Sequence, residues 1–241
     1  MSYQKYRLLC VGHDPKTLKG EKFGYLTGLT YLAPHKLSGL GNVCPHASSG
    51  CIKACLNTAG RGAMQYAQDA RIRKTRLFFQ DRLEYLRQLR FDLSTLSNDA
   101  EYRRMIPCAR LNATSDIPWE KFGVMEAYPS LQFYDYTKNP KRMMAFLAGK
   151  SAGVPMPKNY HLTFSRSESN EDQCLDILRW GGNVAAVFSG GLPSEWKEFP
   201  VVCGDESDLR FLDGKGVVVG LTAKGRGKKD TSGFVISQYG A

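Results

Sequence analysis

Short apolar runs that each end in polar residues recur through the second half of this 241-residue chain, and they constrain its fold more than any other feature. Helical patterns at 140–148 and 170–180 lie between several of them. Buried strands that alternate with helices are typical of a largely parallel sheet. The sequence therefore predicts an α/β fold, organised as one β/α-barrel-like domain over residues 1–241. The runs occupy 105–111, 131–134, 160–164, 184–188, 199–203 and 217–221.

The first half contributes one further strand and a long helical segment. Residues 25–32 favour a strand, and residues 63–98 carry apolar side chains at helical spacing with a break near Asp81. A loop rich in proline, glycine and serine lies between them. In parallel sheets the functional groups gather at the carboxyl ends of the strands, so we expect this loop at that edge.

Three cysteines stand within twelve residues of this loop, Cys44, Cys51 and Cys55, at the spacing C-x6-C-x3-C. Three thiolates hold an iron–sulfur cluster and leave one iron open to a ligand, which we take as the leading interpretation. Zinc bound by the same cysteines and His46 is the alternative, although no C-x2-C pair is present. A loop that binds no metal is the third reading. Cys108 is a candidate for a fourth iron ligand, although a cysteine inside a strand more often only packs.

Polar residues at the predicted strand ends are candidates to line a pocket beside the cysteines. Such groups orient a polar ligand or transfer protons. The alternative is that residues such as Ser115-Asp116 and Ser167-Glu168 only cap helices. We expect catalytic roles for Asp116, Asp135, Lys138, Arg166 and Glu168, and contacts to a cofactor from Asn112, Ser115, Ser165 and Lys224.

The formal net charge of +10 favours a polyanionic partner. Basic residues crowd the segment 71–90 and a second segment at 224–229, and either set could also be an ordinary solvated surface. A nucleic-acid-binding module with a structural cluster or zinc is therefore a second candidate function. A host-interaction protein without catalysis is a third.

The compartment can be inferred from the ends and the cysteines. Residues 1–7 are not followed by an apolar signal segment, and no apolar run reaches the length of a membrane span. The seven cysteines are an odd number, which argues against a disulfide framework. We expect an intracellular protein with no membrane partner, and the sequence leaves its oligomeric state open.

Several long motifs resemble the bacteriophage gene product 88 family. They begin with Asn42-Val43-Cys44-Pro45 and Cys55-Leu56-Asn57-Thr58-Ala59-Gly60-Arg61-Gly62 and extend over most of the chain between residues 25 and 234. The resemblance implies a viral gene expressed in the cytoplasm of a bacterial host, and it implies no particular activity. The further motifs lie at 70–79, 110–117, 132–138, 160–168 and 208–213.

A more distant resemblance is to the radical S-adenosylmethionine (AdoMet) enzymes, which place a three-cysteine loop after the first strand of a partial β/α barrel. That resemblance implies a partial barrel, a 4Fe–4S cluster and AdoMet at the open iron. The usual spacing there is C-x3-C-x2-C, and a Gly-Gly-Glu motif follows the second strand. This chain has C-x6-C-x3-C and Asn112–Asp116 in those places, which argues against AdoMet as the ligand. We expect an iron–sulfur protein with an open iron site, and possible enzymatic activity on a small molecule.

Overall fold

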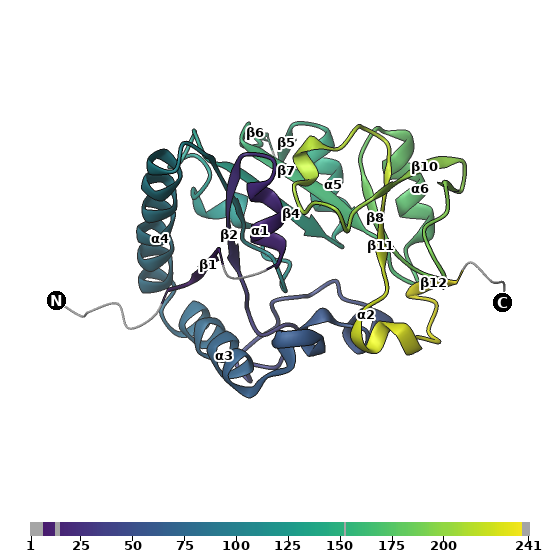
Figure 1. Ribbon diagram of the computed structural model, residues 1–241, viewed down its shortest axis with the longest axis horizontal. Coiled ribbons are helices and arrows are strands. Elements are labelled where there is room, and N and C mark those ends of the chain that lie inside the picture. The colour runs from purple at the N-terminus through teal and green to yellow at the C-terminus, as the bar shows by residue number, and fades with distance from the viewer. Residues whose placement is uncertain (1–6, 13–14, 152, 238–241) are drawn as a thin grey trace.

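A mostly parallel sheet of ten strands organises the computed structural model of this protein, which describes residues 7–12, 15–151 and 153–237 (Figure 1). The strands lie in the order β1-β2-β3-β4-β7-β8-β11-β10-β9, and β12 also pairs with β8. The pairs β1–β2 and β9–β10 are antiparallel, and the other pairs in this sheet are parallel. The strands are β1 Leu9–Val11, β2 Tyr25–Thr30, β3 Ile106–Arg110, β4 Gln132–Thr137, β7 Tyr160–Ser165, β8 Val184–Ser189, β9 Glu195–Trp196, β10 Phe199–Cys203, β11 Val218–Thr222 and β12 Val235–Ser237.

The predicted α/β class and parallel sheet are confirmed, whereas a closed barrel is not found among the described residues. The sheet stays open because β1 and β9, at its two ends, each pair with one neighbour only. A small second sheet joins β5 (Lys150–Ser151) to β6 (Val154–Pro155). All seven strands expected from the sequence are present within a few residues of their predicted bounds.

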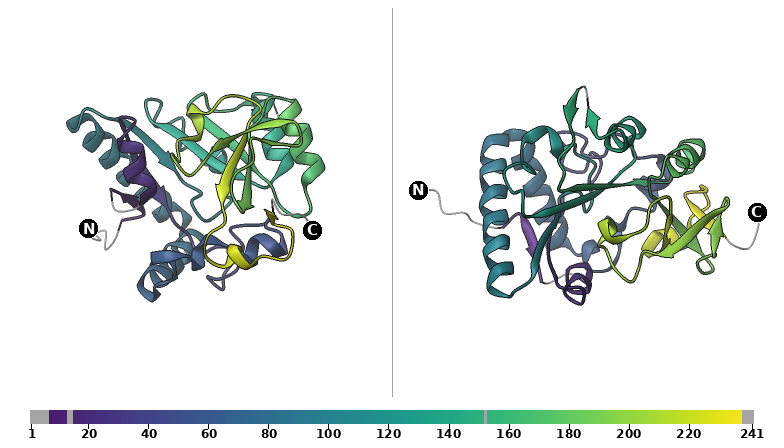
Figure 2. Two further views of the ribbon diagram at one scale, coloured as in Figure 1. Left: turned by 45° about the vertical axis from the view of Figure 1, so that its right-hand side comes forward. Right: turned by 90° about the horizontal axis from the view of Figure 1, so that it is seen from above.

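Helices cover both faces of the sheet (Figure 2). One face of the sheet is covered by three helices, α4 (Arg82–Tyr102), α5 (Pro140–Leu147) and α6 (Glu171–Arg179). Their buried side chains and those of this face form the main apolar core, which includes Leu96, Phe133 and Ile177. On the opposite face lie α1 (Pro15–Glu21) and the segment 204–213, which contains the short turn η4 (Arg210–Leu212). Tyr134 and Leu209 belong to a separate small apolar cluster there.

The predicted break at Asp81 is confirmed. It separates α3 (Gln65–Gln80) from α4, and the Asp81 side chain accepts a hydrogen bond from the N–H of Glu84, which caps the new helix. α3 lies with the cysteine loop at the lower edge of the sheet in Figure 1, beyond the carboxyl end of β2. The sheet therefore presents the cysteine loop at the edge where the parallel strands end.

Candidate functional site

The cysteine loop leaves β2 and folds around two short helical turns, α2 (Ser49–Lys53) and η1 (Leu56–Thr58). Cys51 lies within α2, which begins where Ser48 accepts a hydrogen bond from the N–H of Cys51. Cys55 is the N-cap residue of η1. The thiol of Cys44 lies 3.5 Å from the carbonyl oxygen of Thr114, in the loop after β3. Cys51 thus lies in a capped helical turn and Cys55 directly before the next turn, whereas Cys44 lies in the irregular segment that precedes both.

The pKa of the Cys44 thiol is raised to about 12, chiefly by burial and also by the nearby thiols of Cys55 and Cys51, while a backbone hydrogen bond from His35 lowers it. The pKa of Cys55 is also raised, chiefly by burial, while the charges of Arg71 and Lys138 lower it. The thiols are therefore near enough to influence one another's ionisation. A metal that binds them must displace their protons.

No group of three or more histidine, cysteine, aspartate or glutamate side chains within the described ranges has the geometry of a metal site. The chemistry of the donor set is that of an iron–sulfur site, because Cys44, Cys51 and Cys55 are free and partly buried, and the charges of Arg71 and Lys138 favour the thiolate of Cys55. A cluster at Cys44, Cys51 and Cys55 therefore stays a prediction.

The loop after β3 is organised by Asn112. Its side-chain oxygen accepts hydrogen bonds from the Ser115 hydroxyl (2.7 Å), the Ile117 N–H (2.9 Å) and the Trp119 indole N–H (3.1 Å). Its side-chain amide nitrogen donates to the carbonyl of Ile117. Asn112 is almost fully buried, and its hydrogen bonds, including the one from Ser115, stabilise this loop. The expected contacts of Asn112 and Ser115 to a cofactor stay a prediction.

Asp135 lies in β4 on the face covered by α5 and is completely buried. Its carboxylate accepts hydrogen bonds from the N–H of Asn112 (2.6 Å) and the hydroxyl of Tyr160 (3.2 Å). Burial raises the pKa of Asp135 to about 7, although the Arg142 charge and the Asn112 N–H lower it. The Arg142 guanidinium donates in turn to Tyr160 and Glu120. Asp135 thus belongs to an internal network, which Arg142 connects to Asp116.

Asp116 and Lys138 do reach the cysteine loop. The N–H of Asp116 donates to the carbonyl of Val43 (2.8 Å), and its carboxylate accepts from the N–H of Lys138 (2.9 Å) and from Arg142 (2.9 Å). The Lys138 ammonium lies over the ring of Phe234, 5.4 Å from the centroid. These contacts connect the ends of β3 and β4 to the residue before Cys44.

Glu168 also reaches the loop, from the end of β7. Its carboxylate accepts hydrogen bonds from the Ser48 hydroxyl (2.6 Å) and the Gly50 N–H (2.8 Å). Burial alone would raise the pKa of Glu168, but these hydrogen bonds lower it below the ordinary value. Arg166 donates to the carbonyls of Gly233 and Phe234, and so holds the segment before β12. Glu168 and Arg166 therefore have positioning contacts rather than free functional groups.

The remaining candidates have partners of their own. Ser165 is the last residue of β7, and its carbonyl accepts a hydrogen bond from Asn170. Lys224 forms an ion pair with Asp205. Cys108 is buried inside β3, where its thiol lies 3.2 Å from the Thr27 hydroxyl, on the sheet face opposite to α4. These contacts place Cys108 within the sheet rather than in the cysteine loop.

The basic helix α3 uses much of its charge inside the molecule. Arg71 stacks over the Tyr31 ring and donates to Asn57. Lys74 donates to the carbonyl of Leu8, and burial lowers its pKa. Arg76 donates to the carbonyl of Ser38. Several of the basic residues that suggested a nucleic-acid surface here instead hold the cysteine loop and β1 in place.

A buried polar cluster on the opposite face of the sheet did not stand out in the sequence. The Nη1 of Arg110 in β3 donates to both carboxylate oxygens of Asp208 (2.9 and 3.0 Å), and the guanidinium stacks on the Tyr136 ring at 4.3 Å. Arg210 is also buried and lies 3.3 Å from the Asp213 carboxylate. Tyr134 donates to Asp208 at 3.3 Å. The motif at 208–213 was visible in the sequence, but its partners on β3 and β4 were not.

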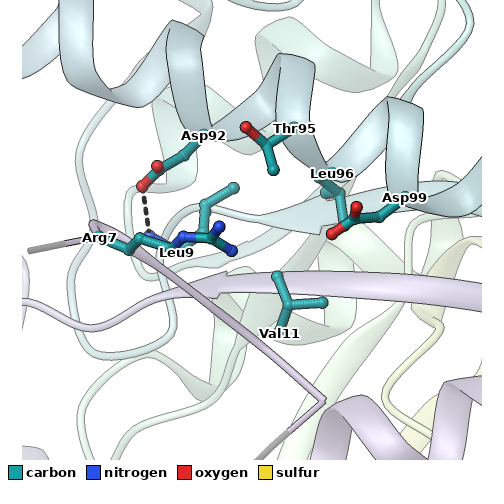
Figure 3. A pocket seen from close by; sticks show the side chains of 7 residues that line it. All are labelled: Arg7, Leu9, Val11, Asp92, Thr95, Leu96 and Asp99. Atoms are coloured by element: carbon teal, nitrogen blue, oxygen red, sulfur yellow. Dashed lines mark hydrogen bonds between the residues drawn. The ribbon is translucent and has the colours of Figure 1, made fainter.

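A small cavity between β1 and α4 contains a further buried carboxylate (Figure 3). The Asp92 side chain accepts hydrogen bonds from the N–H groups of Leu8 (2.6 Å) and Leu9 (3.1 Å). The volume of about 10 Å³ is the room that one water molecule needs. This cavity therefore serves the packing of β1 on α4 and offers no room for a substrate.

A family model described as Gene product 88 matches residues 4–238 of the chain. The chain belongs to the gene product 88 family. The phage family to which the motifs pointed is thereby confirmed. No curated protein and no solved structure matches the chain, and the resemblance to radical AdoMet enzymes stays a prediction. No helix in the part of the chain that the structure describes could cross a membrane.

Proposed function

We propose that this member of the gene product 88 family is a phage iron–sulfur protein in which Cys44, Cys51 and Cys55 bind a 4Fe–4S cluster. The observation that supports it best is the convergence of strand ends on the cysteine loop. Thr114, Asp116 and Glu168 all contact that loop directly. The protein thus stabilises a thiol-rich loop at the edge where parallel sheets place functional sites.

The order of the strands supports a partial β/α barrel as the scaffold. The strands β2, β3, β4, β7 and β8 lie side by side in the sheet in the order in which they occur in the chain, and they are parallel. Helices lie in the connections between them except from β3 to β4, where only the short turn η3 (Trp119–Phe122) occurs. The cysteine loop follows β2, the first of these parallel strands. This is the arrangement that the AdoMet resemblance implies, although the spacing of the cysteines differs from that superfamily.

A cluster held by three thiolates supplies one iron that takes an exogenous ligand. Arg71 and Lys138 lower the pKa of Cys55, and so reduce the cost of its thiolate. The backbone of Lys138 is fixed by Asp116, and its ammonium stays over Phe234 rather than in an ion pair among the described residues. Lys138 is therefore our candidate to orient an anionic small molecule beside the open iron.

Anaerobic purification, with an absorption spectrum and iron and sulfide assays, tests the cluster. We expect a brown protein with about four irons and about four sulfides per chain. A colourless, fully folded protein with stoichiometric zinc would contradict the proposal. Electron paramagnetic resonance spectra of the reduced protein, with AdoMet or small carboxylates added, then test the open iron. A spectrum that responds to none of them would make the cluster structural.

A further inference from the structure

Two segments with the same short sequence, Gly-Arg-Gly, lie side by side at the rim of the cysteine loop. One is Gly60-Arg61-Gly62 in η2 (Gly60–Ala63), and the other is Gly225-Arg226-Gly227 in η5 (Gly225–Lys229). Figure 1 shows η5, in yellow, beside the blue segment that carries α2, and Figure 2 shows the same proximity from another side. The two segments are 165 positions apart in the sequence and meet only in the fold.

The two turns have nearly the same backbone. Each follows a residue in extended conformation, and each begins with a glycine at positive φ, +53° for Gly60 and +54° for Gly225. The second turn also packs on the residue that precedes the first, since a Cβ on Gly225 would lie 2.9 Å from the Cβ of Ala59. The glycines therefore allow both the turn and the close approach, which brings the backbones of the two basic segments together.

This surface is basic and has few acidic neighbours in sequence. Neither residues 51–68 nor residues 214–229 include an aspartate or a glutamate. Asp230, which follows the second turn, accepts hydrogen bonds from Ser232 and Val235. We define the paired-turn surface by its exposed basic side chains, which are Lys53, Arg61, Lys224, Arg226, Lys228 and Lys229.

An exposed aromatic ring flanks the paired-turn surface. Tyr66, 66% exposed, stands in the first turn of α3, five residues after Arg61. Arg61, Arg226, Lys228 and Lys229 form no ion pair with any other described residue. Basic side chains that follow a backbone, together with an aromatic ring for stacking, are the features of surfaces that bind single-stranded nucleic acid.

We propose that the paired-turn surface binds the phosphate backbone of a single-stranded nucleic acid. Arg61 and Arg226 would contact phosphates from the two turns, and Tyr66 would stack on a base. The strand would then cross the loop that carries Cys51 and Cys55, because Cys55 caps the turn η1 against which η5 packs. This inference requires no cluster, since the contacts come from side chains alone.

Fluorescence anisotropy tests the proposal with labelled 20-nucleotide DNA and RNA strands and with the duplex of the same sequence, in a series of salt concentrations. We expect single strands to bind more tightly than the duplex, and the affinity to fall steeply with salt. The DNA and RNA arms decide which nucleic acid is preferred. Tighter binding of the duplex, or no salt-dependent binding of any strand, would overturn the proposal.

Charge-matched variants separate this surface from the overall positive charge. One double variant carries Arg61→Gln and Lys228→Gln and so removes one positive charge from each turn. The control double variant carries Arg103→Gln and Lys158→Gln, which removes the same total charge from exposed sites elsewhere. We expect the first variant to bind about tenfold more weakly and to lower the salt slope by about 1.4, since each single-strand phosphate contact contributes about 0.7. Equal weakening in both variants would refute a specific surface.

Tyr66→Ala should also weaken binding by about tenfold through lost stacking. Vesicles of anionic lipid serve as a competing polyanion, and binding to them alone would contradict the proposal.

Discussion

The carboxylate of Glu168 accepts a 2.8 Å hydrogen bond from the N–H of Gly50, which joins the end of β7 to the first turn of α2 across 118 positions of sequence. The hydroxyls of Ser48 (2.6 Å) and Ser49 (3.3 Å) donate to the same carboxylate. A negative charge at the start of a helical turn satisfies N–H groups that have no partner within the turn. Glu168 therefore fixes the turn that carries Cys51.

Glu168→Gln should destabilise this part of the molecule. The variant keeps one acceptor oxygen but loses the charge that strengthens the hydrogen bonds from Ser48 and Gly50. We expect the free energy of unfolding to fall by about 1 kcal/mol, measured by chemical denaturation, and cluster retention to fall with it. Glu195→Gln, at an exposed position of β9, is the control and should change neither quantity. Equal effects of the two substitutions would contradict a role for Glu168 in the loop.

Gly50→Ala tests the same junction from the other side. A Cβ at Gly50 would lie 2.8 Å from the Glu168 carboxylate and 2.8 Å from the Cβ of Phe234, and closer still to the Ser232 hydroxyl. Because these contacts are too short, we expect a loss of about 1–3 kcal/mol in thermal or chemical unfolding. Gly214→Ala, where the nearest atom is 3.8 Å away, should cost far less. If the two variants are equally stable, the loop is not held as tightly as the contacts indicate.

Much of this fold can be predicted from the sequence because buried strands read as apolar runs. The run at 184–188 became β8, and the break at Asp81 follows from its capping side chain. β4 extends beyond the predicted 131–134 to Thr137, because the polar Asp135 is buried by partners from other elements. Such partners cannot be recognised locally. The pairing of β12 with β8 is a long-range contact of the same kind.

The site was predictable to a similar extent. The spacing of the cysteines and the strand-end rule indicated which residues contact the loop, and Asp116 and Glu168 do so. The rule could not distinguish a residue that faces the loop from one that supports it. Asn112 and Asp135 follow the same pattern in sequence, yet they are buried among Tyr160, Trp119 and Ile117.

The buried pair of Arg110 and Asp208 should be important for stability. Asp208→Asn leaves the guanidinium of Arg110 buried without its charged partner, and we expect a loss of about 3–5 kcal/mol in the free energy of unfolding. Asp176→Asn removes one partner of the exposed pair Arg179–Asp176 and should cost less than about 1 kcal/mol. Denaturant titrations of both variants compare the two pairs. A loss of similar size in both would show that Arg110 is solvated when Asp208 is neutral.

Substitution of individual cysteines tests the proposed ligands. Cys44→Ala, Cys51→Ala and Cys55→Ala should each lose or destabilise the cofactor, since each removes one of three thiolates. Cys203, which is exposed in β10, and Cys174, which is a buried residue of α6, provide the controls. Iron and sulfide content and the visible spectrum are measured after anaerobic purification. A full cluster in Cys51→Ala, together with loss in Cys203→Ala, would refute the assignment.

Asp135 should give the protein an unusual dependence on pH. Burial raises the pKa of this carboxyl from 3.8 to about 7 in the folded state, so the fold retains a proton that the unfolded chain releases. The stabilisation that protonated Asp135 contributes is fully present below pH 4. It is lost as the pH rises to about 7, at about 1.4 kcal/mol of unfolding free energy per pH unit. Asp135→Asn cannot ionise. Its stability relative to the wild type should therefore increase between pH 4 and 7, by up to about 4 kcal/mol, and level off above that range.

The stability that His161 contributes should depend on pH in the opposite direction, so this residue serves as a control. Burial, and then the charge of Arg210, lower its pKa from 6.5 to about 4, so the folded protein keeps the imidazole neutral while the unfolded chain binds a proton. The stabilisation that neutral His161 contributes is present above pH 6.5 and is lost as the pH falls to about 4.

In the wild type the effects of Asp135 and His161 on stability oppose each other between pH 4 and 6.5. The stability of His161→Gln relative to the wild type should therefore decrease as the pH rises from 4 to 6.5, whereas that of Asp135→Asn increases. Urea titrations at several pH values measure both differences, and a difference for Asp135→Asn that does not vary with pH would show that Asp135 is ionised in the fold.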